Sequence, residues 1–127
     1  MKDNQVLDRS FDFAVRVVNL NKYLAGEKKE YVLSKQLLRS GTSIGANINE
    51  AQAAQSRNDF ISKMCIASKE ARETKYWLKL LVATDYLPES HPNTKSLLAE
   101  AETLIKILTA IIKSTQAKQL SREGTQT

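Results

Sequence analysis

Apolar residues recur at intervals of three and four along most of this chain, which is the spacing of one face of an α-helix. In residues 58–86, one such face is formed by Phe60, Met64, Ala67, Ala71, Thr74, Leu78 and Leu81. No stretch alternates apolar and polar residues as a half-buried strand would. The pattern therefore predicts an all-α protein.

The residues that interrupt this periodicity divide the chain into four helices. Gly26 ends the first, a polar turn at 55–58 ends the second, and Pro88 and Pro92 end the third. The predicted helices cover residues 5–25, 31–54, 58–86 and 94–119. Short links between helices of similar length favour antiparallel neighbours. We expect one antiparallel up-down four-helix bundle over residues 1–120, followed by a disordered polar tail at 121–127.

The first predicted helix carries two apolar stripes on different sides. One stripe consists of Leu7, Phe11, Ala14 and Val18. The other consists of Phe13, Val17, Leu20 and Leu24. Together they span roughly 220° of the helix surface, about twice the width of an ordinary core-facing stripe. The helix either packs deeply between two neighbours or, as we favour, uses its second stripe as a subunit interface.

The second predicted helix is unusually rich in small residues between Arg39 and Ala51. Gly41 and Gly45 each cost about 1 kcal/mol relative to alanine inside a helix. A phosphate-binding loop would need a glycine motif after a strand, and neither is present. We therefore interpret the glycines as the place where another helix backbone approaches closely.

Charged side chains predict how the second and third helices align. A narrow polar arc of the second helix holds Arg39, Ser43, Asn47 and Glu50. Beside its core face, the third helix holds Lys63, Glu70, Glu73 and Trp77. A hairpin that turns near Ser56 brings Arg39 opposite Glu73. The same register brings Glu50 opposite Lys63, so we predict two ion pairs between these helices.

The residue counts disfavour most catalytic and metal sites. The chain has 127 residues, with one cysteine, Cys65, and one histidine, His91. A single cysteine excludes an internal disulfide, and paired-metal bundles require Glu-x-x-His motifs that are missing here. We expect no enzyme activity, metal or cofactor. Neither a signal peptide nor an apolar run of membrane-spanning length is evident, so we expect a cytoplasmic protein.

The formal net charge is +5 with an isoelectric point near 9.4, and the charge is spread along the chain. One row of basic residues follows the third helix, on the side away from Glu70 and Glu73: Lys69, Arg72, Lys75 and Lys79. Such a row can follow a phosphate backbone, or it can be an ordinary solvated face. Assembly into a ring would repeat the row and strengthen a weak contact.

Two segments carry a resemblance to a known family. Residues 37–51 read LLRSGTSIGANINEA, and residues 69–78 read KEARETKYWL. They resemble the two signature blocks of the four-helix bundle proteins encoded in 23S rRNA intervening sequences, with a likeness over about residues 11–113. The resemblance implies a small cytoplasmic bacterial bundle that assembles as a homopentamer. No catalytic residue is carried over, and the matching motif residues are interpreted as structural or interface residues.

The resemblance also extends to accessory proteins of diversity-generating retroelements, which are basic pentamers that bind nucleic acid and a reverse transcriptase. We therefore expect a non-catalytic homo-oligomer that binds RNA or DNA through its basic residues, with RNA favoured. The alternative is a scaffold for a protein partner, for example an accessory subunit of a reverse transcriptase, with no direct nucleic-acid role.

Overall fold

Four helices joined by three short loops make up the part of the chain that the computed structural model describes, residues 2–126, with side chains described for 5–124. The helices are α1 (Lys2–Gly26), α2 (Leu33–Ala51), α3 (Arg57–Ala83) and α4 (Pro92–Gln126). Residues 2–126 contain no strand. The predicted all-α architecture of four helices is confirmed.

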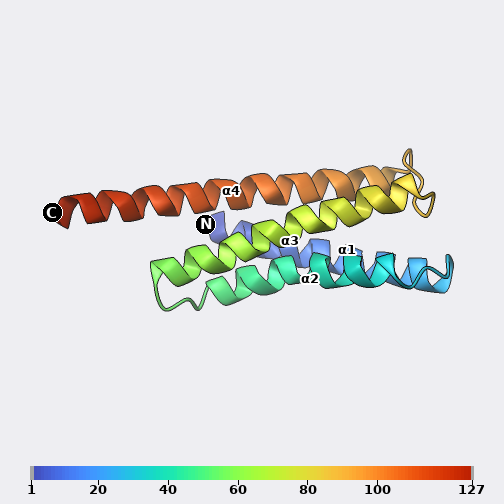
Figure 1. Cartoon of the computed structure of the whole chain (residues 1–127), viewed down its shortest axis with the longest axis horizontal. Helices are drawn as coiled ribbons and strands as arrows, with labels where there is room; N and C mark the ends of the chain where they lie inside the picture. The colour runs from blue at the N-terminus through green and yellow to red at the C-terminus, as the bar shows by residue number, and fades with distance from the viewer. Residues whose placement is uncertain (1, 127) are drawn as a thin grey trace.

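Each helix packs against two others: α2 lies against α1 and α3, and α4 lies against α3 and α1. Successive helices run in opposite directions along the long axis of the molecule (Figure 1). The contact between α1 and α4 joins distant parts of the chain, because Arg9 donates two hydrogen bonds, of 2.9 and 2.7 Å, to the carboxylate of Glu100. A core of buried apolar residues from all four helices fills the centre.

Side chains in the loops fix where two of the helices begin. The hydroxyl of Ser56 accepts a hydrogen bond of 3.0 Å from the Asp59 amide and caps α3. Before α2, the buried carboxylate of Glu30 accepts from the amides of Val32, Leu33 and Ser34 at 3.1, 3.0 and 2.7 Å. Burial disfavours the charged form of Glu30, but these backbone hydrogen bonds outweigh burial and hold its pKa below the ordinary value. The charged carboxylate therefore anchors the link between α1 and α2.

The end of α4 differs from the sequence prediction. We expected a disordered tail at 121–127, but the helix continues through Gln126, and residue 127 lies outside the described residues. No proline interrupts the segment after Pro92, and the backbone hydrogen bonds of a helix are local and need no packing partner. The last turns consequently project past the bundle (Figure 1).

The assignment of the apolar stripes on α1 was wrong. Phe13, Val17 and Leu24 are fully buried in the core of their own chain, and the half-buried Leu20 packs against them. They are therefore not a subunit interface. The first stripe is the more exposed one, with Phe11 69% exposed, and Val15 next to it is 45% exposed. The wide apolar surface arises because α1 packs against both α2 and α4.

The glycines of α2 do mark a close helix approach, as predicted. A Cβ atom built on Gly41 would lie 2.7 and 2.8 Å from the two Cγ atoms of Val17. At Gly45 it would lie 3.3 Å from the Ser10 hydroxyl and 3.4 Å from the Ser10 carbonyl oxygen. The backbones of α1 and α2 therefore come together at a distance that a larger residue at Gly41 would not permit.

We predict that Gly41→Ala destabilises the protein by about 1–2 kcal/mol, because overpacking against Val17 exceeds the gain in helix propensity. Gly26→Ala is the matched control, since no atom lies within 4 Å of a Cβ there. Urea unfolding followed by circular dichroism, at one protein concentration, measures both. A Gly41→Ala variant as stable as the wild type would contradict the close approach.

Candidate functional site

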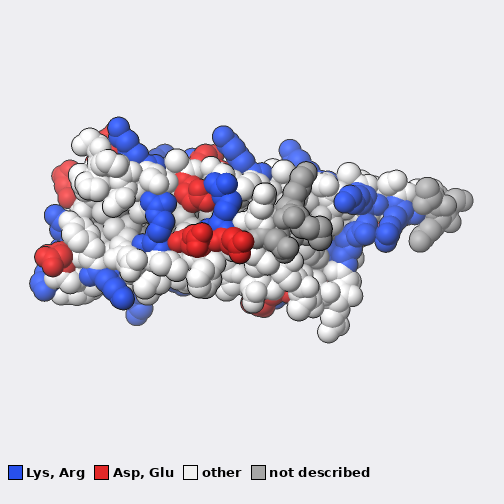
Figure 2. All heavy atoms as spheres, turned by 180° about the vertical axis from the view of Figure 1, so that it is seen from behind, with Lys and Arg blue, Asp and Glu red and all other residues white. Residues whose placement is uncertain are grey.

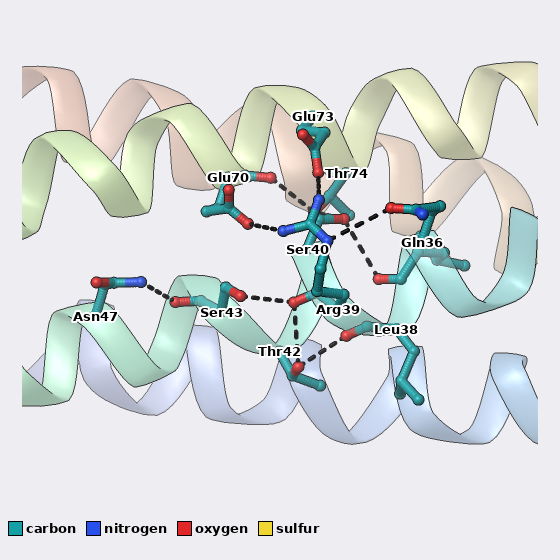
Figure 3. A network of polar contacts seen from close by, with 11 residues as sticks. Gln36, Leu38, Arg39, Ser40, Thr42, Ser43, Asn47, Glu70, Glu73 and Thr74 are labelled. Carbon is teal, nitrogen blue, oxygen red and sulfur yellow. Dashed lines mark hydrogen bonds and ion pairs between the residues drawn. The ribbon is translucent and has the colours of Figure 1, made fainter.

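The most concentrated polar cluster joins α2 to α3 around Arg39 (Figure 3). The Arg39 guanidinium donates to Glu70 Oε2 at 3.0 Å and forms an ion pair with Glu73. Its Nε also donates to Gln36 Oε1 at 3.4 Å. The Arg39 side chain is 49% exposed, while that of Glu70 is only 12% exposed. One cation thus neutralises two carboxylates that lie one helical turn apart.

A second ion pair between α2 and α3 lies nearer the turn that joins them, where Lys63 Nζ is 3.2 Å from Glu50 Oε1. Both cross-helix pairs predicted from the sequence are therefore confirmed. The role of Glu70 as a second partner of Arg39 was missed. Its spacing of three residues from Glu73 was the available signal, because such residues share one helix face.

The other motif residues also support the packing of α2 and α3. The buried hydroxyls of Ser40 and Thr74 share a hydrogen bond of 2.9 Å across the interface. Asn47 donates to the Ser43 carbonyl at 2.9 Å within its own helix. Trp77 packs against the core, and its ring makes a T-shaped contact with that of Tyr76. Its indole N–H has no partner among the described residues.

This cluster is suited to structure rather than to catalysis. Arg39 neutralises both Glu70 and Glu73, which leaves neither as a free base. Within the described residues, no three His, Cys, Asp or Glu side chains gather closely enough to hold a metal ion. Cys65 is exposed. The polar contacts around Arg39 therefore set the register of α2 against α3.

The basic row on α3 is only partly available to a ligand. Lys69, Arg72 and Lys79 are exposed. Lys75, in contrast, forms an ion pair with Glu102 of α4. The hydrogen bond from Lys75 lowers the pKa of Glu102, and the charges of Lys75, Lys106 and Arg72 lower it further. Glu102 therefore stays ionised and offsets part of the positive charge of the row.

Lys106 is a basic residue that the sequence analysis did not connect with this row. Its charge acts on Glu102, as does that of Arg72, so it lies on the same side of the α3–α4 pair. Only the alignment of α3 with α4 reveals this neighbour. We refer to four exposed residues as the basic surface: Lys69, Arg72, Lys79 and Lys106.

Further basic residues occur where α4 projects beyond the bundle. From residue 111 onward the chain carries Lys113, Lys118 and Arg122 but only one acid, Glu123. Figure 2 shows blue atoms gathered near this projecting end, whereas blue and red atoms are interleaved over the centre of the same face. The positive charge is therefore less evenly distributed in space than along the sequence.

An exposed apolar face lies on the outside of α1. Phe11 and Val15 contribute most of it, and the half-buried Val18 continues the same helix face at a spacing of four and three residues. We refer to these three residues as the outer face. No described helix is both long and apolar enough to span a membrane.

A family comparison identifies the fold. The family model described as 23S rRNA-intervening sequence protein matches residues 2–110. The chain belongs to this family. The match includes the Arg39 cluster, the glycines and the basic row, and it stops before the basic end of α4.

A solved structure supports the same conclusion. The chain is 57% identical, with a TM-score of 0.85, to a protein of unknown function from the S23 ribosomal protein family of Bacteroides thetaiotaomicron VPI-5482. The likeness covers 89% of this chain and 99% of that one. No curated protein matches the chain.

We predict that Arg39→Met destabilises the protein by about 1–2 kcal/mol, because Glu70 and Glu73 are then left side by side without a cation. Lys63→Met removes the more exposed ion pair, that with Glu50, and should lower the stability by about 0.5 kcal/mol or less. Chemical unfolding of both variants provides the comparison. Adding Glu73→Gln to Arg39→Met should restore part of the lost stability. Equal losses of stability in Arg39→Met and Lys63→Met would contradict this account of the cluster.

Proposed function

We propose that the protein is a non-catalytic homo-oligomer, assembled as a pentamer of antiparallel up-down bundles, that binds RNA without reading its sequence. The observation that carries the proposal is the basic surface. Lys69, Arg72 and Lys79 are exposed on one side of α3, and Lys106 of α4 lies on the same side. From Lys69 to Lys79 the row extends for about 15 Å along α3. That length is sufficient to contact several phosphates of one strand.

Assembly would compensate for the small number of charges on each subunit. A single basic surface holds four cations beside the carboxylate of Glu102, which favours weak binding. Repetition around a ring converts several weak contacts into one stronger interaction. The family description, which refers to an intervening sequence of 23S rRNA, supports RNA as the nucleic acid.

The outer face is the surface we propose for contact between subunits. Phe11 is 69% exposed, and a large aromatic side chain in that position is costly to leave in water. Val15 lies one turn further along α1, so the two side chains form one patch. The outer face lies on α1 and the basic surface on α3 and α4, so a ring built through the first leaves the second accessible.

We predict that the wild type has a mass about five times the 14.2 kDa of one chain in light scattering. Phe11→Glu combined with Val15→Glu should give a folded single chain, because charged side chains oppose burial of the outer face. Tyr76→Glu is the control, since Tyr76 is 58% exposed but lies on α3. A doubly substituted protein that keeps the wild-type mass would exclude the outer face as the interface.

We predict that Arg72→Glu combined with Lys79→Glu weakens RNA binding at least tenfold at low salt, since both phosphate contacts become repulsive. Fluorescence anisotropy with a labelled single strand measures the affinity. The matched control is Lys28→Glu combined with Lys29→Glu, which changes the net charge equally in the loop between α1 and α2. Equal losses in both variants would indicate a general charge effect rather than binding at the basic surface.

A scaffold for a protein partner, such as an accessory subunit of a reverse transcriptase, is the second candidate. Ile66 and Tyr76 favour it, because both are exposed apolar side chains on α3 near the basic residues. Wild-type protein that fails to bind RNA even at low salt, and that recovers a protein at fixed stoichiometry after nuclease treatment, would replace the first proposal with this one.

A further inference from the structure

A pocket of about 540 Å³ opens where α1 passes the loop 84–91 and the start of α4. Its apolar part is lined by Leu20, Leu87 and Leu97, of which the last two are almost fully buried. Its polar part is lined by Arg16, His91 and Thr94. None of the residues that line it is acidic.

Thr94 lines this pocket and has two hydrogen-bond donors that no other described residue accepts. It is the third residue of α4 and is only 4% exposed. The neighbouring amides are occupied, because Asn93 donates to His91 Nδ1 at 3.1 Å and Lys95 donates to the His91 carbonyl at 3.1 Å. Neither the amide nor the hydroxyl of Thr94 has a partner among the described residues. The Thr94 hydroxyl is not one of the fully buried atoms that lack a partner, so it reaches the pocket and can donate to a ligand there. The free amide is ordinary for the first turn of a helix, whose N–H groups have no partner within the helix.

The electrostatic surroundings favour a negatively charged acceptor. The first turn of α4, a helix of 35 residues, carries the positive end of the helix dipole. Arg16 of α1 donates one hydrogen bond to the Ser96 hydroxyl at 3.0 Å, which leaves most of its guanidinium donors unused. Because His91 Nδ1 accepts from the Asn93 amide, the neutral ring carries its proton on Nε2 and can donate one hydrogen bond more.

We propose that this pocket binds a small organic anion. Its phosphate or carboxylate group accepts hydrogen bonds from Thr94 and Arg16, and its apolar body lies against Leu20, Leu87 and Leu97. The apolar lining accounts for an organic ligand rather than an inorganic ion. This proposal depends neither on RNA binding nor on the number of subunits.

Ligand-observed NMR of the full-length protein tests the proposal with three probes of similar size. Phenyl phosphate and benzoate carry the two anionic groups, and benzyl alcohol is the neutral comparison. At least one of the two anions should bind saturably. Benzyl alcohol, which has no charge, should bind at least about tenfold more weakly than that anion. The anion that binds more tightly identifies the group that the pocket prefers.

Two variants locate the site. Arg16→Gln and Thr94→Val should each weaken binding of the preferred anion about tenfold, because each removes a donor to a charged group. Ser96→Ala removes the hydroxyl that accepts from Arg16 but leaves the Arg16 guanidinium and its charge in place. This variant should bind the anion as tightly as the wild type. Arg9→Gln removes a cation from the same helix outside the pocket and should also leave binding unchanged.

The variants must keep the wild-type circular dichroism spectrum for the comparison to hold, and Arg16→Gln and Thr94→Val provide independent readings if one of them unfolds. Saturable anion binding that both substitutions weaken would establish the site. Absence of saturable binding by both anions up to about 10 mM, or equal binding by the wild type and both variants, would overturn the proposal.

Discussion

The close approach of α1 to α2 is the constraint on which the rest of the structure depends. Gly41 leaves room for Val17, and Gly45 leaves room for the backbone at Ser10. Two contacts one turn apart fix both the position of α1 along α2 and its rotation about its own axis. That rotation buries Phe13 and turns Phe11 outward. The same contact therefore determines which residues form the core and which form the outer face.

The charges of α3 are separated by the direction in which they point. Glu70 and Glu73 lie toward α2, where Arg39 neutralises them. Lys75 lies toward α4, where it pairs with Glu102. The cations that remain exposed, Lys69 and Arg72 among them, therefore face solvent without a partner on their own helix face. This separation allows one helix to join two neighbours and still present positive charge.

Much of this arrangement could be predicted from the sequence because the signals were local or depended on a single turn. The helices follow from apolar spacing, and the pairing of Arg39 with Glu73 follows from the register of one hairpin. The orientation of α1 could not be predicted in this way, because both of its stripes have helical spacing and only contact with Gly41 distinguishes them. The partner of Lys75 could not be predicted either, because it depends on how α4 aligns with α3. The pocket at Thr94 combines α1, a loop and α4, which no sequence motif records.

The most direct test of the account is one salt series on nuclease-treated wild-type protein, with RNA affinity and mass measured in the same buffers. The account predicts a mass about five times that of one 14.2 kDa chain and a logarithm of affinity that falls linearly and steeply with the logarithm of salt concentration. A single chain that binds no RNA at low salt, or binding that does not respond to salt, would contradict it.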